Sequence, residues 1–132
     1  MDLAGAQVSA LAAAHDVHVR VLDLAVDDDL AGVDPDVQRF KVRRSSEPIH
    51  LDDALTADEV ERALAAGATV AREEIEAGAD LLISGDMGIG NTTPATALIA
   101  ALLGLPAADL TGRGTGIDDD ALVRKQELVQ QD

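Results

Sequence analysis

The feature that most constrains the fold of this chain is a glycine-rich run between a short apolar segment and an Ala- and Leu-rich segment. The run spans residues 85–94 and reads GDMGIGNTTP, and it directly follows the apolar residues 81–83. Glycines let the backbone approach a ligand closely, and the start of a helix offers N–H groups and the positive end of the helix dipole. A strand, a glycine loop and a helix start in this order predict a phosphate-binding loop.

The run differs from the P-loop of nucleotide triphosphatases at one position. Gly85, Gly90 and Thr92 fit the pattern GxxxxGK[ST], but Asn91 stands where that pattern has lysine. Because the P-loop lysine neutralises the β- and γ-phosphates, its absence argues against a triphosphate ligand.

The run also departs from the dinucleotide-binding pattern GxGxxG. Gly88 and Gly90 fit this pattern, whereas Thr93 replaces the third glycine, which normally allows close helix–strand packing. What remains suits one phosphate held by backbone amides and by the hydroxyl groups of Thr92 and Thr93. A second glycine-rich turn, GRGTG, follows at residues 112–116.

The spacing of apolar residues, together with residues that start or end helices, predicts alternating helices and strands. The first half is expected to hold a helix over 3–15, a strand over 17–24 and a loop over 25–55. A helix follows from the capping box of Thr56 and Glu59 to Gly78, and then a strand over 80–84. The last part is expected to hold a helix over 92–103, a short strand or turn over 107–111, and a helix from 118–120 to about 130. This order predicts an α/β fold with a parallel sheet and ligand loops at the carboxyl ends of its strands. Two strands make an incomplete sheet.

The composition excludes several classes of function. The chain has 132 residues, which suits one domain, a single aromatic residue (Phe40) and a formal net charge of −15. Base stacking needs aromatic side chains and this charge repels polyanions, so we expect no nucleic-acid partner. Cysteine is absent, no apolar run approaches the roughly 18 residues that span a bilayer, and the N-terminus lacks a signal peptide's basic segment. We therefore expect a cytoplasmic protein without membrane contact.

Three groups of polar residues are candidates for further chemistry. Lys41, Arg43 and Arg44 form the only dense basic cluster of the long loop, which is either an anion site near an active site or a solvated loop. The acidic runs at 27–29 and 118–120 lack the spacing of a metal-binding loop, so no metal is expected. The histidines show no metal-ligating spacing either and are interpreted as structural or surface residues: His15, His18 and His50.

The glycine run, the Lys-Val-Arg-Arg segment before it and the second glycine turn together resemble one family, the nicotinate-nucleotide:dimethylbenzimidazole phosphoribosyltransferases of cobalamin assembly. Their signature GEMGIGNTTP is matched throughout residues 85–94 except at Asp86, where glutamate is usual. The resemblance covers essentially the whole chain but only the middle of a family member. It implies a Rossmann-like parallel sheet with flanking helices, incomplete here. Residues 1–132 would form a single partial α/β domain, without the family's small helical domain.

The resemblance also implies a reaction and its site residues. Phosphoribose would pass from nicotinate mononucleotide to 5,6-dimethylbenzimidazole, giving nicotinate and α-ribazole 5′-phosphate, with no cofactor. Asp86 would steady developing positive charge, and Lys125 falls where the family has an active-site lysine, although it could also be a solvated helix lysine. The residues implied in holding the substrate phosphate are Gly88, Ile89, Gly90, Asn91, Thr92 and Thr93.

The glutamate regarded as the family's general base lies outside this sequence. The chain alone is therefore expected to be inactive in transfer, and the family implies a homodimer. The alternative is a non-catalytic fragment or degenerate paralogue that binds a nucleotide monophosphate, since binding needs only the loop whereas transfer also needs deprotonation. An acidic interaction protein without a ligand would leave both glycine turns unexplained.

Overall fold

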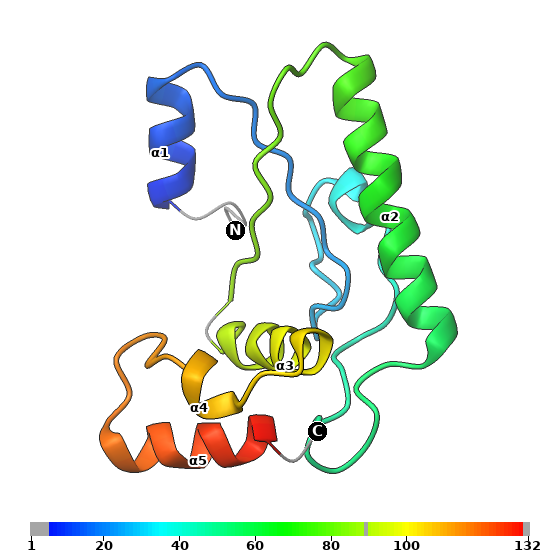
Figure 1. The fold of residues 1–132 in the computed structure, drawn as a ribbon. Helices are drawn as coiled ribbons and strands as arrows, with labels where there is room; N and C mark the ends of the chain where they lie inside the picture. The colour runs from blue at the N-terminus through cyan, green and yellow to red at the C-terminus, as the bar shows by residue number, and fades with distance from the viewer. Residues whose placement is uncertain (1–5, 89, 131–132) are drawn as a thin grey trace. The chain divides into compact units, whose positions relative to one another are not determined.

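The computed structural model describes residues 6–88 and 90–130, which fall into two compact units. The first unit comprises Met1–Ser46 and Leu55–Ala79, and the second comprises Glu47–Ala54 and Asp80–Asp132. Figure 1 shows the helices of both units along the chain. None of the described helices combines the length and the apolar composition needed to cross a bilayer.

The first unit is organised around one long helix. Its described elements are α1 Ala6–Ala14, the 3₁₀ helix η1 Pro35–Gln38 and α2 Ala57–Glu76. The predicted capping box is confirmed: the Glu59 N–H donates to the Thr56 hydroxyl at 3.3 Å, and the Thr56 N–H donates to the Glu59 carboxylate at 2.8 Å. These two bonds satisfy backbone donors that a helix start leaves unpaired.

The side of α2 that contacts the rest of the first unit is polar. Arg20 donates to Glu74 at 3.0 Å, Arg39 pairs with Glu73 at 2.6 Å, and the Arg62 guanidinium donates to the Val42 carbonyl at 3.0 Å. Several large apolar side chains of α2 are solvent-exposed: Val60, Leu64 and Ile75. Polar contacts with Arg20 and with the loop therefore help to attach α2 within this unit, and Ala66 is the buried residue of the helix.

The two predicted strands are not strands in the described residues. Residues 17–24 and 80–84 run as extended chain without a hydrogen-bonded neighbour ladder (Figure 1). The first segment makes isolated backbone bonds, such as Asp23 N–H to Val37 O and Val42 N–H to Leu24 O, both at 2.8 Å. A strand exists only through pairing, so an alternating apolar pattern without a partner segment gives extended chain instead. The predicted Rossmann-like sheet is accordingly not seen.

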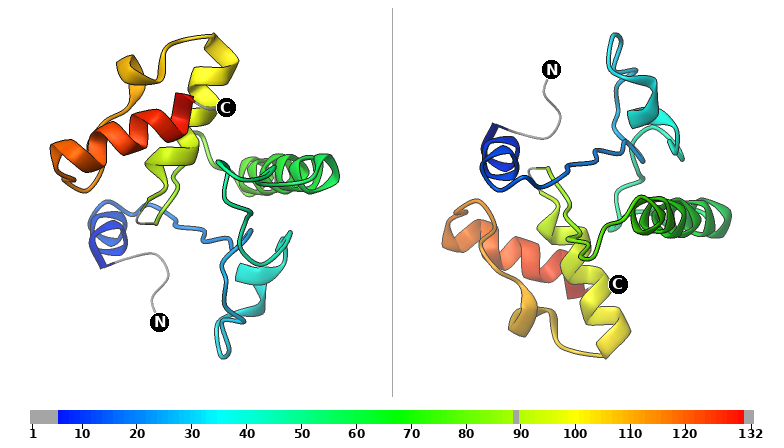
Figure 2. Two further views of the ribbon diagram at one scale, coloured as in Figure 1. Left: turned by 90° about the horizontal axis from the view of Figure 1, so that it is seen from below. Right: turned by 90° about the horizontal axis from the view of Figure 1, so that it is seen from above.

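The second unit is a small cluster of helices: α3 Thr92–Leu103, α4 Ala107–Leu110 and α5 Asp119–Gln130. These helices pack against one another, and Figure 2 shows them side by side from below and from above. Ala100, Ala107 and Val129 form their buried core, with Ala97 and Leu110 packed against it. Small side chains at this centre let the three helices approach closely.

The helix bounds of the second unit confirm two predictions and correct one. α3 spans the predicted residues, and α5 begins where the acidic run was expected to cap it, because the Ala121 N–H donates to the Asp118 carboxylate at 2.8 Å. Residues 107–111, predicted as a short strand or turn, contain the single-turn helix α4. Gln130 accepts the Ala107 N–H at 3.2 Å and Ala107 accepts the Thr111 hydroxyl at 2.7 Å, so contacts from α5 and from the next residue stabilise this turn.

Candidate functional site

The glycine run forms a loop that holds its own shape at the start of α3. The Asn91 amide group donates to the Asp86 carbonyl at 2.9 Å, and the Asn91 N–H donates to the Gly88 carbonyl at 3.3 Å. The Thr93 N–H reaches the Gly90 carbonyl at 3.1 Å. Asn91 occupies the N-cap position but makes no side-chain cap bond to α3. The helix start is therefore not closed by a side chain, as the phosphate-binding prediction requires.

Two glycines of the run have different reasons to be glycine. Gly90 has a φ of +95°, a backbone conformation that side chains other than glycine's rarely adopt. Gly88 has no such φ, and a Cβ built on it meets nothing within 4 Å. The φ of Gly90 favours glycine at that position, whereas the φ of Gly88 does not, and the space beside both glycines is open. Ile89, also predicted to hold phosphate, lies outside the described residues.

Lys125 joins the glycine run to the second glycine turn. Its ammonium group donates to the Thr92 hydroxyl at 2.8 Å and to the Gly112 carbonyl at 3.1 Å. The side chain comes from α5, and the residue is only 9% exposed. Lys125 is thus a buried residue at the start of α3, which contradicts the interpretation of a solvated helix lysine.

The second glycine turn lies against this contact. A Cβ built on Gly114, whose φ is +55°, would be 3.1 Å from the Thr92 hydroxyl oxygen and 3.8 Å from the Lys125 nitrogen. The arginine of the same turn, Arg113, donates to the Ile117 carbonyl at 2.9 Å and pairs with Asp119. The turn is therefore held by its own arginine while Gly112 and Gly114 lie against Lys125 and Thr92.

Asp86, the predicted charge-stabilising carboxylate, is exposed in the glycine run. Among the described residues, no hydrogen bond or ion pair joins its carboxylate to Lys125 or to another cation. Its backbone carbonyl, by contrast, is engaged by Asn91. Of the predicted phosphate residues, Thr92 is thus brought to Lys125, whereas the Asp86 carboxylate makes no bond to that lysine.

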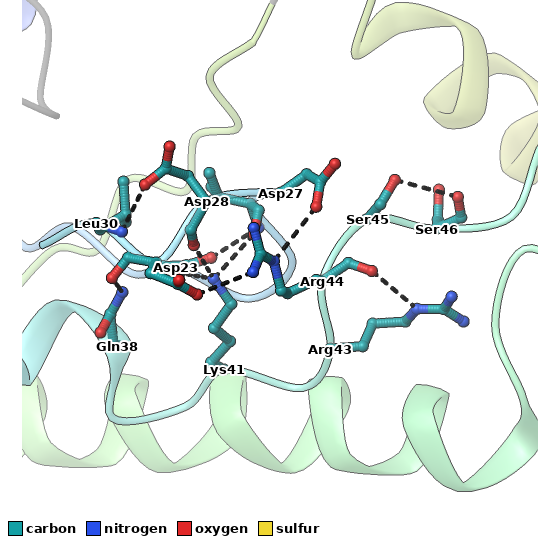
Figure 3. A network of polar contacts seen from close by, with 12 residues as sticks. Asp23, Asp27, Asp28, Leu30, Gln38, Lys41, Arg43, Arg44, Ser45 and Ser46 are labelled. Atoms are coloured by element: carbon teal, nitrogen blue, oxygen red, sulfur yellow. Dashed lines mark hydrogen bonds and ion pairs between the residues drawn. The ribbon is translucent and has the colours of Figure 1, made fainter.

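The basic cluster of the long loop is engaged by carboxylates within the first unit (Figure 3). The Lys41 ammonium donates to the buried Asp23 carboxylate at 2.7 Å and to the carbonyls of Val26 and Asp28 at 2.8 and 2.7 Å. Arg44 pairs with Asp27 at 3.3 Å and with Asp29 at 3.0 Å. Arg43 pairs with Glu59 at 3.3 Å. These cations hold the loop together, which supports neither an open anion site nor a merely solvated loop.

A second charged group joins Arg20 to two glutamates of α2, Glu73 and Glu74. Hydrogen bonds to Glu74 and then to Glu73 raise the pKa of the Arg20 guanidinium above its ordinary value. The hydrogen bond from Arg39, followed by that from Arg20, lowers the pKa of the Glu73 carboxyl despite an opposing effect of burial. The backbone N–H of Thr56 is the largest cause that lowers the pKa of the Glu59 carboxyl. The contacts that cause these shifts stabilise the charged forms of the three side chains, which we therefore interpret as structural.

The structure offers no metal centre in the part of the chain that it describes. No group of three or more His, Asp or Glu side chains is placed to hold a metal ion there. The three histidines are all exposed, as expected for surface residues. His18 lies 4.0 Å from Glu74, a distance at the limit of an ion pair.

Sequence reasoning identified Thr92 and Lys125 separately but missed their contact. The bond spans 33 positions, and only the packing of α5 on α3 brings the two side chains together. Nothing in the pattern of the second glycine turn indicates that Gly114 lies against Thr92. Asp23 was also missed, although a lone aspartate at the end of an apolar alternation is a usable signal for a buried carboxylate.

The whole chain is similar to known phosphoribosyltransferases. A family model described as phosphoribosyltransferase matches residues 1–132. The curated nicotinate-nucleotide–dimethylbenzimidazole phosphoribosyltransferase of Mycolicibacterium paratuberculosis is 54% identical over 129 residues, which are 98% of this chain and 36% of that protein. The protein of the same name from Mycobacterium bovis is 50% identical over 133 residues, with the same shares covered.

A solved structure gives the same result in three dimensions. The crystal structure of CobT from Thermus thermophilus matches with a TM-score of 0.88 and 46% identity, over 96% of this chain and 38% of that one. This chain therefore shares the fold of the corresponding part of that protein. The chain spans little more than a third of the length of the relatives that it matches.

Proposed function

This chain belongs to the phosphoribosyltransferase family, and on that premise we propose that the protein containing it transfers 5-phosphoribose from nicotinate mononucleotide to 5,6-dimethylbenzimidazole. The observation that carries the proposal is the start of α3, where the glycine run, the second glycine turn and the buried Lys125 meet. Relatives named for this reaction support the choice of substrates.

Residues 88–93 of the glycine run would bind the 5′-phosphate of the mononucleotide. Gly88 leaves space for close approach, while Thr92 and Thr93 offer hydroxyl groups at the first turn of α3. Anions are favoured at a helix N-terminus by the dipole and by the first N–H groups. Gly90 and Asn91 would shape the loop around the phosphate, and Ile89 would contribute its backbone.

Transfer breaks the bond between the ribose C1′ and the nicotinate nitrogen and forms a bond from C1′ to a benzimidazole nitrogen. The electron pair of the broken bond leaves with nicotinate. The benzimidazole gives the proton of its ring nitrogen to a carboxylate base, the role that the family resemblance assigns to a glutamate outside this sequence. The exposed Asp86 carboxylate would steady positive charge that develops on the ribose as the old bond breaks. Lys125 would support the phosphate end of the site from beneath Thr92.

The test is product formation by the intact protein that carries this chain. We expect α-ribazole 5′-phosphate and nicotinate by chromatography when both substrates are present, and calorimetric binding of nicotinate mononucleotide. Binding without product would instead support the non-catalytic alternative, and absence of both would refute the proposal.

A pair of glycine variants locates the phosphate. In Gly88→Ala the added methyl group occupies space open to the ligand, so the affinity for nicotinate mononucleotide should fall about tenfold, the lower end of an overpacking cost of about 1–3 kcal/mol. Gly85→Ala is the matched control, because its Cβ also meets nothing within 4 Å and the residue is not assigned to the phosphate. Equal affinities of the two variants would refute the assignment.

The same proposal extends to the rest of the family fold. Leu81 and Ile83 are 77% and 82% exposed in an extended segment, as expected of a strand whose partners lie elsewhere in the fold. We therefore propose that residues 80–84 lie in a parallel sheet of the intact protein. We also propose that the intact protein is a cytoplasmic homodimer. Amide exchange over residues 80–84 tests the sheet, and the mass of the intact protein in solution tests the homodimer.

A further inference from the structure

We propose that Lys125 is a positioning residue that acts through Thr92, orienting the Thr92 hydroxyl as a hydrogen-bond donor toward the bound phosphate. The inference rests on the proposed function and deepens it. It assigns the lysine a role behind the phosphate-binding residue instead of a contact with the phosphate itself, and it makes the second glycine turn part of the same device.

The contact with Lys125 fixes the direction of the Thr92 hydroxyl proton. A lysine ammonium has three donors and no acceptor, so in the 2.8 Å contact the Thr92 oxygen accepts. The proton of that hydroxyl must then point away from Lys125. A phosphate oxygen only accepts, and a hydroxyl held as a donor therefore matches it.

Lys125 itself is firmly held. Its ammonium also donates to the Gly112 carbonyl at 3.1 Å, and the residue is 9% exposed, so its position is set from two sides. The Thr96 hydroxyl donates to the Thr92 carbonyl at 2.6 Å and leaves the Thr92 hydroxyl to Lys125. Thr92 itself is exposed, so its hydroxyl proton has access to a ligand.

The positive charge of Lys125 has no opposite charge beside it among the described residues. Among the described residues its acceptors are one hydroxyl and one carbonyl, with no carboxylate in ion-pair distance. Withdrawing a cation from water without an opposite charge is costly. An anionic ligand beyond Thr92 supplies that charge through the hydroxyl, which polarises toward it.

The second glycine turn needs glycine at position 114. A Cβ on Gly114 would lie 3.1 Å from the Thr92 oxygen, tighter than most contacts of real Cβ atoms, and the φ of +55° disfavours any side chain. A side chain there would displace the hydroxyl that Lys125 orients. Gly114 is thus a second positioning residue for Thr92.

A double-mutant cycle on nicotinate mononucleotide affinity tests the inference in the intact protein. If Lys125 acts only through Thr92, then Thr92→Val and Lys125→Met each weaken binding about tenfold, and the double variant is no weaker than the weaker single. If the lysine contacts the phosphate directly, the losses multiply to about a hundredfold, which would overturn the inference. Arg124→Met removes a positive charge one residue away on the exposed side of α5 and should leave affinity unchanged.

Kinetics separate positioning from general loss of structure. Lys125→Met should raise KM for nicotinate mononucleotide about tenfold and leave kcat and KM for 5,6-dimethylbenzimidazole unchanged. Thr92→Ser, which keeps a hydroxyl, should retain most of the affinity, whereas an affinity as low as that of Thr92→Val would contradict the role of the hydroxyl. A wild-type protein that neither binds the mononucleotide nor forms product would refute the proposed function, whereas an active wild type with multiplying losses refutes only this inference.

A second variant tests the same idea if Lys125→Met does not fold. Gly114→Ala should weaken mononucleotide binding about tenfold, and adding Thr92→Val to it should cause no further loss, because both changes act on one hydroxyl. Wild-type affinity in Gly114→Ala, or a multiplied loss in the double variant, would overturn the inference.

Discussion

Lys41 in the first compact unit and Lys125 in the second are both withdrawn from solvent, but they donate to different acceptors. Lys41 reaches the buried carboxylate of Asp23 as well as two carbonyls, so its charge is matched within the unit. Lys125 reaches a hydroxyl and a carbonyl. The difference indicates that the first lysine serves the structure, whereas the second is left with charge that a ligand can match.

The starts of α2 and α3 repeat this contrast. Thr56 and Glu59 close the start of α2 with a reciprocal capping box. Asn91 at the start of α3 makes no side-chain cap bond, although the loop before it is well held by its own hydrogen bonds. A helix start that is not capped by its own chain is the one with room for an anion.

The sharpest way to break the contrast is to give Lys125 the carboxylate that Lys41 has. Thr92→Asp should place a negative charge beside the ammonium and beside the bound phosphate. Two like charges about 4 Å apart at an effective dielectric of about 20 repel by about 4 kcal/mol, so mononucleotide affinity should fall roughly a thousandfold. Thr92→Asn, neutral and of similar size, is the control in calorimetry, and a similar loss in both would show that charge is not the cause.

Removing each lysine in turn compares their structural value. Lys41→Met leaves the Asp23 carboxylate buried without its cation, which should lower the free energy of unfolding by about 3 kcal/mol. Lys125→Met leaves only a hydroxyl and a carbonyl unpaired and should cost about 1 kcal/mol. Urea denaturation measures both, and equal losses would remove the basis of the contrast.

A smaller difference is expected between the two helix starts. Thr56→Ala removes the hydroxyl that accepts the Glu59 N–H and should destabilise the protein by about 1 kcal/mol. Asn91→Ala removes only the exposed bond to the Asp86 carbonyl and should cost about 0.5 kcal/mol. Thermal unfolding of the two variants measures the difference, and a larger loss from Asn91→Ala would mean that this residue caps α3 after all.

Acid should weaken the first unit through Glu59, by the smallest of these effects. The Thr56 N–H lowers the folded-state pKa of this carboxyl below its ordinary value of 4.5. The Glu59 carboxylate therefore contributes fully to the stability of the folded state above that pH. The contribution is lost as the pH falls through the lowered pKa, because the unfolded state then binds the proton more readily. Amide exchange in α2 between about pH 6 and about pH 3 should show the loss. Glu59→Gln should reduce this pH dependence, whereas Glu61→Gln, on an exposed residue, should not.

Local signals predicted the helices, but partners far along the chain decided the rest. Thr56 and Glu59 predict the start of α2, and the acidic run predicts the cap that Asp118 provides for α5. Residues 107–111 were predicted wrongly because Gln130, 23 positions away, accepts the first amide of α4. The strand patterns lacked the pairing segments that make strands. The glycine run predicted the phosphate loop, but its contact with Lys125 depends on how α5 packs on α3.

The 33 positions between Thr92 and Lys125 also matter while the protein is being made. The glycine loop is synthesised well before the lysine that supports it. At about 5–20 residues per second, roughly 2–7 s separate the synthesis of the two residues. During that interval a nascent chain carries the complete loop without its support. The bond between the Lys125 ammonium and the Thr92 hydroxyl can therefore form only after Lys125 has been made and α5 has packed on α3.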